Sequence, residues 1–235
     1  MHSQLLVRET LRVMLENLNI APETLLMLPV ILFALSVHEA AHAWTADKGG
    51  DDTARLLGRV TLNPISHIDP IGTILVPVVL IYSGMPAFGW AKPVPVQPHR
   101  LKNGNWFALV AAAGPISNLL IAVVALLAMF IGTFFVPYSD WPEAVRVLGF
   151  YTVLINVVLM VFNLLPVPPL DGSKIFFQYV VSGRVHLYKY WEMVEQMGFM
   201  LVFILLMIPG VRYFLVWISM ATASMIFYAV ERGGM

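Results

Sequence analysis

Long apolar runs constrain this chain more than any other feature of its sequence. A helix that rises about 1.5 Å per residue needs roughly 20 residues to cross a hydrocarbon core about 30 Å thick. Because a membrane supplies no water to unpaired backbone groups, runs of that length predict membrane helices. Such runs cover residues 24–46, 107–136, 144–165 and 196–230. Pro209 and Gly210 interrupt the last run, which fits one kinked span or a tight hairpin.

Composition supports lipid as the solvent. Of the 235 residues, 59% are hydrophobic and 12% are charged, whereas soluble domains are about half apolar and a quarter charged. The formal net charge is zero and the basic residues are scattered, which argues against a nucleic-acid partner. The chain has no cysteine, so disulfides, a thiolate nucleophile and cysteine ligands are excluded. We therefore expect an all-α polytopic membrane protein, a helical bundle surrounded by a lipid bilayer.

Shorter segments suggest re-entrant or β-like loops between these helices. Residues 70–82 are apolar but have only about the length of a half-membrane element. Residues 55–62 could form a short strand, and residues 90–96 carry prolines at alternate positions that suit an extended edge strand. We expect one membrane-embedded domain over residues 1–235. Its parts are an interfacial amphipathic helix at 1–23, with a loosely ordered tail as the alternative, a core at 24–182 and a C-terminal membrane segment at 196–230.

The distribution of positive charge predicts the topology. Lysines and arginines occur in loops 47–69, 83–106 and 171–195, and none occurs in the connection 137–143. Basic loops remain on the cytoplasmic side, so we expect the first three loops there. This arrangement requires residues 70–82 to enter the membrane and return without crossing it.

The sequence His38-Glu39-Ala40-Ala41-His42 is an HExxH motif in the first apolar run. Positions i and i+4 share one helix face, so the two imidazoles can bind one metal ion. Glu39 is placed beside such an ion, where it can take a proton from water without being a ligand. The alternative, polar residues satisfied within a bundle, is weak because ionisable groups inside a span are costly.

A catalytic zinc needs a third protein ligand and an open position. Asp171 follows a segment in which Pro166, Pro168 and Pro169 must break the preceding helix, and this break can turn its carboxylate inward. Taken alone, Asp171 is better explained as the N-cap of a helix that begins near Ser173.

The two motifs together resemble the site-2 protease family of intramembrane metalloproteases. The resemblance covers residues 30–180 and rests on HExxH and on Asn163 to Gly172, which fits Asn-x-x-Pro-x-Pro-x-Leu-Asp-Gly. It implies that His38, His42 and Asp171 bind one Zn²⁺ ion and that Glu39 is the catalytic base. It also implicates Asn163 in stabilising the reacting carbonyl, with a helix C-cap as the alternative.

Further stretches, Gly58 to Pro64 and Gly89 to Pro93, resemble a short, single-domain branch of the family that has neither a PDZ nor a CBS domain. Asn118 belongs to a Gly-Pro-x-x-Asn element, where we expect an inter-helix hydrogen bond in preference to substrate contact. For His67 we expect a hydrogen-bonded loop residue in preference to a place near the metal.

The resemblance implies hydrolysis of peptide bonds in or near the transmembrane segments of membrane proteins, with Glu-activated, zinc-bound water as the nucleophile. It further implies a multi-pass protein of the bacterial inner membrane, with the active site nearer the cytoplasm. One rival is a metal transporter or sensor that uses the same ligands. Another is a metalloprotease whose third ligand is a glutamate, for which the candidates are Glu143, Glu192 and Glu195.

Overall fold

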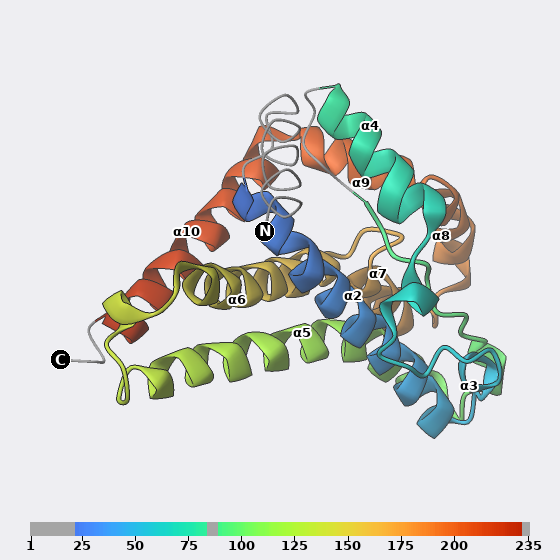
Figure 1. The fold of residues 1–235 in the computed structure, drawn as a ribbon. Coiled ribbons are helices and arrows are strands. Elements are labelled where there is room, and N and C mark those ends of the chain that lie inside the picture. Colours follow the sequence, from blue (N-terminus) through green and yellow to red (C-terminus); the bar gives the residue numbers. More distant parts are fainter. Residues whose placement is uncertain (1–21, 84–88, 232–235) are drawn as a thin grey trace.

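The computed structural model describes residues 22–83 and 89–231 (Figure 1). The interfacial helix expected at 1–23 therefore falls almost entirely outside the described residues. The α-helices are α2 (Pro22–Gly49), α3 (Thr53–Leu56), α4 (Val76–Tyr82), α5 (Gly104–Gly132), α6 (Glu143–Asn163), α7 (Asp171–Phe176), α8 (Val185–Gln196), α9 (Gly198–Met207) and α10 (Pro209–Glu231). Short 3₁₀ or π turns are η1 (Pro64–His67), η2 (Pro70–Leu75), η3 (Pro98–Arg100), η4 (Tyr138–Asp140) and η5 (Phe177–Val181).

The expected all-α polytopic architecture is confirmed. Four helices are long and apolar enough to cross a membrane: Met27–Gly49 within α2, α5, α6, and Pro209–Val230 within α10. The described residues contain no strand. The chain is thus a multi-pass membrane protein.

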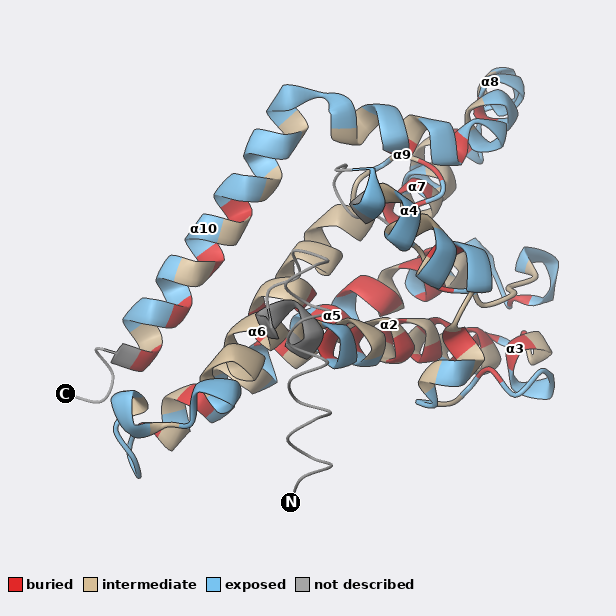
Figure 2. Cartoon of the chain, turned by 45° about the horizontal axis from the view of Figure 1, so that its top comes forward, coloured by how far each residue is buried: buried red, intermediate tan, exposed pale blue. Residues whose placement is uncertain are grey.

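Helices α2, α5 and α6 form the centre of the bundle, and burial is concentrated on α2 and α5 (Figure 2). Both helices bury small side chains: Ala34, Ala43 and Ala46 of α2 and Ala111 of α5 are at most 1% exposed. Small residues let helix backbones approach closely where lipid provides no hydrophobic drive. The site described below depends on this close approach.

The C-terminal run divides at Pro209. Helix α9 ends at Met207, and α10 begins at Pro209 and extends away from α9 along α6 (Figure 1). Proline lacks a backbone N–H and suits the first turn of a helix, so a new helix begins there. Helix α10 is long enough to span by itself, whereas α9 pairs with α8 across a bend of 72°.

The strand predicted at residues 55–62 is wrong. Residues Thr53–Leu56 form the helical turn α3, followed by a turn at Gly58 with φ of 67°. Helix α3 buries Ala54 completely, and Asp51 accepts hydrogen bonds at its start. This tertiary anchoring overrides the weak strand propensity of a short segment.

The edge strand predicted at residues 90–96 is likewise absent as a strand. The segment has no regular secondary structure, and its backbone groups bond to side chains and to loop carbonyls in place of a neighbouring strand.

Residues Pro70–Tyr82 form η2 followed by α4, a length of roughly 20 Å that falls short of a membrane core. The predicted short apolar element is therefore present.

Asp51 connects the end of α2 to the segment that precedes α5. Its side chain is 0% exposed, and its carboxylate accepts hydrogen bonds from the Gln97 N–H at 2.6 Å and from both the N–H and the hydroxyl of Thr53. Burial alone would raise the pKa of Asp51. The donors on Gln97 and Thr53, with Arg100 nearby, outweigh burial and hold this pKa below its ordinary value.

We expect Asp51→Ala to lower the free energy of unfolding by about 2–3 kcal/mol, because it removes bonds to a charged acceptor. Thermal unfolding in detergent measures this change. Asp52→Ala is the matched control, since its ion pairs with Arg55 and Arg100 lie on partly exposed side chains and should contribute less than about 1 kcal/mol.

The contribution of Asp51 should also depend on pH. Because its folded pKa lies below the unfolded value, the stabilisation is present above about pH 4 and disappears as the pH falls through the folded value. The difference between wild type and Asp51→Ala should shrink only on acidification. Equal unfolding of both proteins at neutral pH would contradict this role.

Candidate active site

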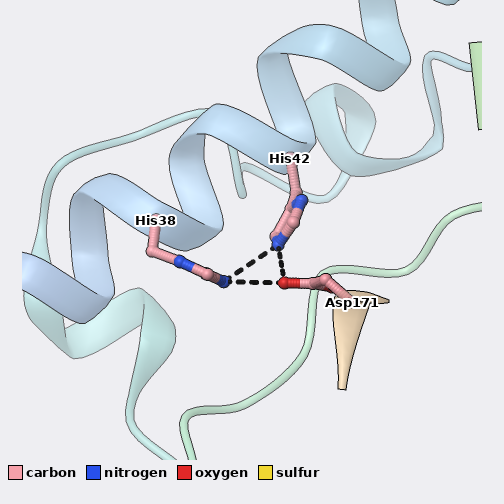
Figure 3. A group of neighbouring side chains, drawn as sticks. All are labelled: His38, His42 and Asp171. Atoms are coloured by element: carbon pink, nitrogen blue, oxygen red, sulfur yellow. Dashed lines mark hydrogen bonds and ion pairs between the residues drawn. The ribbon is translucent and has the colours of Figure 1, made fainter. Parts of the chain in front are cut away.

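His38 and His42 lie one turn apart on the inward face of α2 (Figure 3). They are 4% and 6% exposed, and their Nε2 atoms are 3.0 Å apart. The i, i+4 spacing predicted this shared face, and the structure confirms it. Both histidines therefore present the same ring nitrogen to one point.

Asp171 supplies the third atom at that point. Its Oδ2 lies 3.1 Å from Nε2 of each histidine (Figure 3). It is the first residue of α7, reached after α6 ends at Asn163 and the proline-rich segment turns the chain back. The turn is tight, since a Cβ on Gly172 would lie 2.2 Å from the carbonyl oxygen of Leu164.

The three side chains form a group that could hold a metal ion. Two imidazole nitrogens and one carboxylate oxygen lie within 4.8 Å of one another, and all three residues are buried. Two histidines and one carboxylate match the donor set of catalytic zinc sites, which keep a further position open. The residues present therefore fit a zinc ion.

Hydrogen bonds on the far side of each ring orient the histidines. His42 Nδ1 lies 2.6 Å from the Val110 carbonyl oxygen, and His38 Nδ1 lies 2.6 Å from Asn118 Oδ1. A backbone carbonyl only accepts, so His42 must carry a proton on Nδ1, and in the neutral ring Nε2 then keeps the lone pair that a metal ion needs. Such outer contacts fix ring orientation and strengthen metal ligands.

Asp171 is held by a cation as well as by the histidines. Lys174 Nζ donates to Asp171 Oδ1 at 3.0 Å, one turn along α7. The ammonium group of Lys174 therefore places a positive charge beside the Asp171 carboxylate and favours its ionised form.

Helix α5 approaches the site without a side chain at Gly114. A Cβ added there would lie 2.5 Å from Nε2 of both His38 and His42. Only glycine leaves this space open. The opening adjoins the atoms at which the predicted metal would sit.

Glu39 is not a member of the ligand group and faces a different neighbour. Its Oε2 accepts a hydrogen bond of 2.9 Å from the Val94 N–H, in the irregular segment before α5. The same segment is bonded at Lys92, whose N–H donates to the His67 carbonyl and whose carbonyl accepts from Arg59. The segment is therefore held beside the motif glutamate.

His67 is the hydrogen-bonded loop residue that we expected. Its ring is 3% exposed, with Nε2 at 2.9 Å from the Thr61 carbonyl oxygen. Asn163, predicted at the reacting carbonyl, lies at the end of α6, where its Nδ2 donates to the Leu159 carbonyl. Neither residue belongs to the ligand group, so a role for Asn163 stays a prediction.

The glutamates considered as a third ligand lie elsewhere. Glu143 begins α6, and Glu192 and Glu195 are on α8; all three are exposed. Among the described residues, the group that contains the two histidines is completed only by Asp171. The alternative with a glutamate ligand therefore has no support in the structure.

Some residues at the site were missed or undervalued by sequence reasoning. The sequence predicted an inter-helix hydrogen bond for Asn118 but did not identify His38 as its partner. A polar amide within an apolar helix was the feature that could have drawn attention to it. The contacts of Lys174 and of the Val110 carbonyl could not be recognised in the sequence. A lysine three residues after an aspartate is common in proteins, and every residue has a backbone carbonyl.

Comparison with known proteins identifies the family. The sequence model described as "Peptidase family M50" matches residues 138–205. The Bacillus subtilis protein named "Putative zinc metalloprotease YwhC" is 38% identical over 80% of this chain and 82% of its own length. The chain belongs to peptidase family M50, the site-2 protease family.

A second relative agrees with this assignment. The Mycolicibacterium smegmatis protein named "Putative zinc metalloprotease Rip2" is 31% identical over 86% of this chain and 76% of its own length. No solved structure matches the chain significantly. The M50 chain is a zinc metalloprotease, which confirms the predicted enzyme class and cofactor and sets aside the transporter alternative.

Gly114→Ala should abolish most zinc binding, because the added methyl group would collide with Nε2 of both histidines. Zinc content of the purified protein, measured by elemental analysis, checks this expectation. Gly210→Ala is the matched control, since a Cβ there has nothing within 4 Å. Normal zinc content in Gly114→Ala would show that α5 does not constrain the site.

Proposed function

We propose that this M50 chain is an intramembrane zinc metalloprotease that hydrolyses peptide bonds in or near the transmembrane segments of other membrane proteins. The convergence of His38, His42 and Asp171 carries the proposal. Both histidines lie in the candidate span Met27–Gly49, so the site is inside the helical bundle. We also propose that residues 1–235 form one domain, because α2, α5 and α7 all contribute to this site.

In this proposal His38, His42 and Asp171 hold the zinc ion. A zinc ion bound there polarises the scissile carbonyl and makes an attacking water more acidic. The protein keeps both Nε2 atoms available by occupying each Nδ1 with an acceptor. Lys174 limits Asp171 to one orientation by binding its other oxygen.

Glu39 is the proposed general base. It takes a proton from the attacking water and later delivers this proton to the leaving amine. The Val94 N–H holds one carboxylate oxygen, which fixes the side chain and leaves the other oxygen for the water. Asn163 is proposed to help the reacting carbonyl with the second N–H of its amide, which its bond to Leu159 does not use.

The segment around Val94 is the proposed place for the substrate chain. A helical substrate hides its peptide bonds, so it must unwind locally before hydrolysis. An irregular segment that touches Glu39 could align an unwound chain through main-chain hydrogen bonds. Water could reach the site where irregular backbone replaces helix, at residues 89–97 and 164–170.

Glu39→Gln should lower cleavage of a model membrane-spanning substrate by at least about 100-fold, because the amide keeps the shape and loses the basicity. The substrate should carry a helix-weakening residue near its cleavage site. Zinc content should remain at the wild-type level, whereas Asp171→Ala, the matched ligand variant, should lose most of its zinc. Wild-type cleavage by Glu39→Gln would rule out the proposed base.

We further propose that the protein lies in a bacterial inner membrane with its active site nearer the cytoplasm. The basic loops support this orientation. The chain has no cysteine of its own, so single cysteines report cleanly on exposure. Leu62→Cys, His99→Cys and Val185→Cys, all at exposed positions, should react with impermeant thiol reagents from the cytoplasmic side only.

Ser139→Cys, in the connection between α5 and α6, is the matched control and should react from the opposite side. Reaction of the His99 and Leu62 variants from opposite sides would show that α4 and its neighbouring turn cross the membrane. That result would contradict the proposed orientation.

A further inference from the structure

Asn156 lies on α6 and is 0% exposed, although α6 is an apolar candidate span. A buried amide in such surroundings is costly unless it is hydrogen-bonded. The roles proposed above make no use of this residue. It nevertheless lies only one side chain away from the histidine pair, because it binds Asn118.

Hydrogen bonds run continuously from the backbone of α6 to the metal-ligating group. Asn156 Nδ2 donates to the Thr152 carbonyl at 2.8 Å, and Asn118 Nδ2 donates to Asn156 Oδ1 at 2.8 Å. Asn118 Oδ1 is 2.6 Å from His38 Nδ1. The series joins α6, α5 and α2 through side chains that are almost completely buried.

The first acceptor decides the direction of every bond in the series. The Thr152 carbonyl can only accept, so the amide nitrogen of Asn156 must face it and the amide oxygen must face Asn118. Asn118 must then turn its nitrogen to Asn156 and its oxygen to His38. An oxygen facing the ring requires the proton on His38 Nδ1, which leaves the Nε2 lone pair directed at the site.

We propose that Asn156 is a positioning residue for His38: acting through Asn118, it fixes the orientation and the tautomer in which Nε2 can bind zinc. This inference rests on the proposed function, in which His38 is a zinc ligand. A free Asn118 amide could rotate and present its nitrogen to the ring, which would favour the opposite tautomer. Asn156 prevents that rotation.

His42 provides an internal comparison. Its Nδ1 binds the Val110 backbone carbonyl. Unlike a side-chain amide, a carbonyl cannot rotate to present a donor in place of its acceptor. His42 therefore needs no second residue to fix its tautomer. A purely structural role of Asn156 between α5 and α6 would not distinguish the two histidines, whereas the proposed role affects only His38.

Asn156→Leu tests the proposal because it keeps a similar volume and removes both hydrogen bonds. We expect its zinc affinity, measured by competition with a chromophoric chelator, to fall about 10- to 100-fold. Thr152→Val is the matched control: it removes the bond from the Thr152 hydroxyl to the Leu148 carbonyl and keeps the carbonyl that Asn156 uses. Its affinity should equal that of wild type.

Asn156→Asp is the conservative variant. A carboxyl group at position 156 would face the Thr152 carbonyl, which can only accept and therefore favours the protonated acid. Its O–H can then donate to that carbonyl and its other oxygen can accept from Asn118. We expect this variant to retain zinc affinity close to wild type. A loss as large as that of the leucine variant would overturn the proposal.

Proton spectra of zinc-loaded protein with labelled histidine provide a second readout. Wild type should show protected Nδ1–H protons for both His38 and His42. Asn156→Leu should lose protection at His38 and keep it at His42. A wild-type His38 without a protected Nδ1–H would overturn the proposal even if the leucine variant does not fold.

The same measurements separate this inference from the proposed function. If His38→Ala binds zinc as tightly as wild type, His38 is not a ligand and the proposed site itself fails. If His38→Ala loses zinc while Asn156→Leu binds it as tightly as Thr152→Val, only the role of Asn156 fails.

Discussion

The close approach of α2 and α5 is the constraint on which the site depends. Three donor atoms near 3 Å from one another require their helices to pack without bulky side chains between them. Gly114 and the buried alanines of α2 provide this space. In lipid, such packing and inter-helix hydrogen bonds must supply the association that the hydrophobic effect supplies in water. The packing that holds α2 against α5 therefore also brings the candidate metal ligands together.

The break after α6 brings Asp171, the third candidate ligand, to that contact. Prolines end the helix, and Gly172 lets the chain pass close to the carbonyls of Leu164 and Leu165 just after α6, so Asp171 enters the bundle at the start of a new helix. Burying an aspartate costs free energy unless its charge is compensated. Lys174, whose Nζ donates to the second carboxylate oxygen, supplies a compensating positive charge.

The segment at 89–97 packs beside the HExxH motif. Its N–H groups bond to Asp51 in the connection after α2, to Glu39 of α2 and to the His67 carbonyl at the end of η1. Because Pro93 and Pro95 have no N–H, the segment cannot form a complete strand ladder, and side chains from α2 and its following loop hold it in place. The polar residues around the motif therefore position the backbone of this segment as well as the candidate metal ligands.

The sequence alone determined the membrane helices, the shared face of His38 and His42, and the break before Asp171. These features depend on apolar length, helical period and proline, all of which act locally along the chain. The zinc chemistry was predicted from the HExxH motif together with the resemblance to the site-2 protease family. Only the tertiary structure decided that Asn118 and Asn156 stand behind His38, that Val94 meets Glu39, and that residues 53–56 form a helical turn where a strand was expected. Hydrogen-bond partners far apart in sequence follow from which helices pack together, and local periodicity carries no information about that choice.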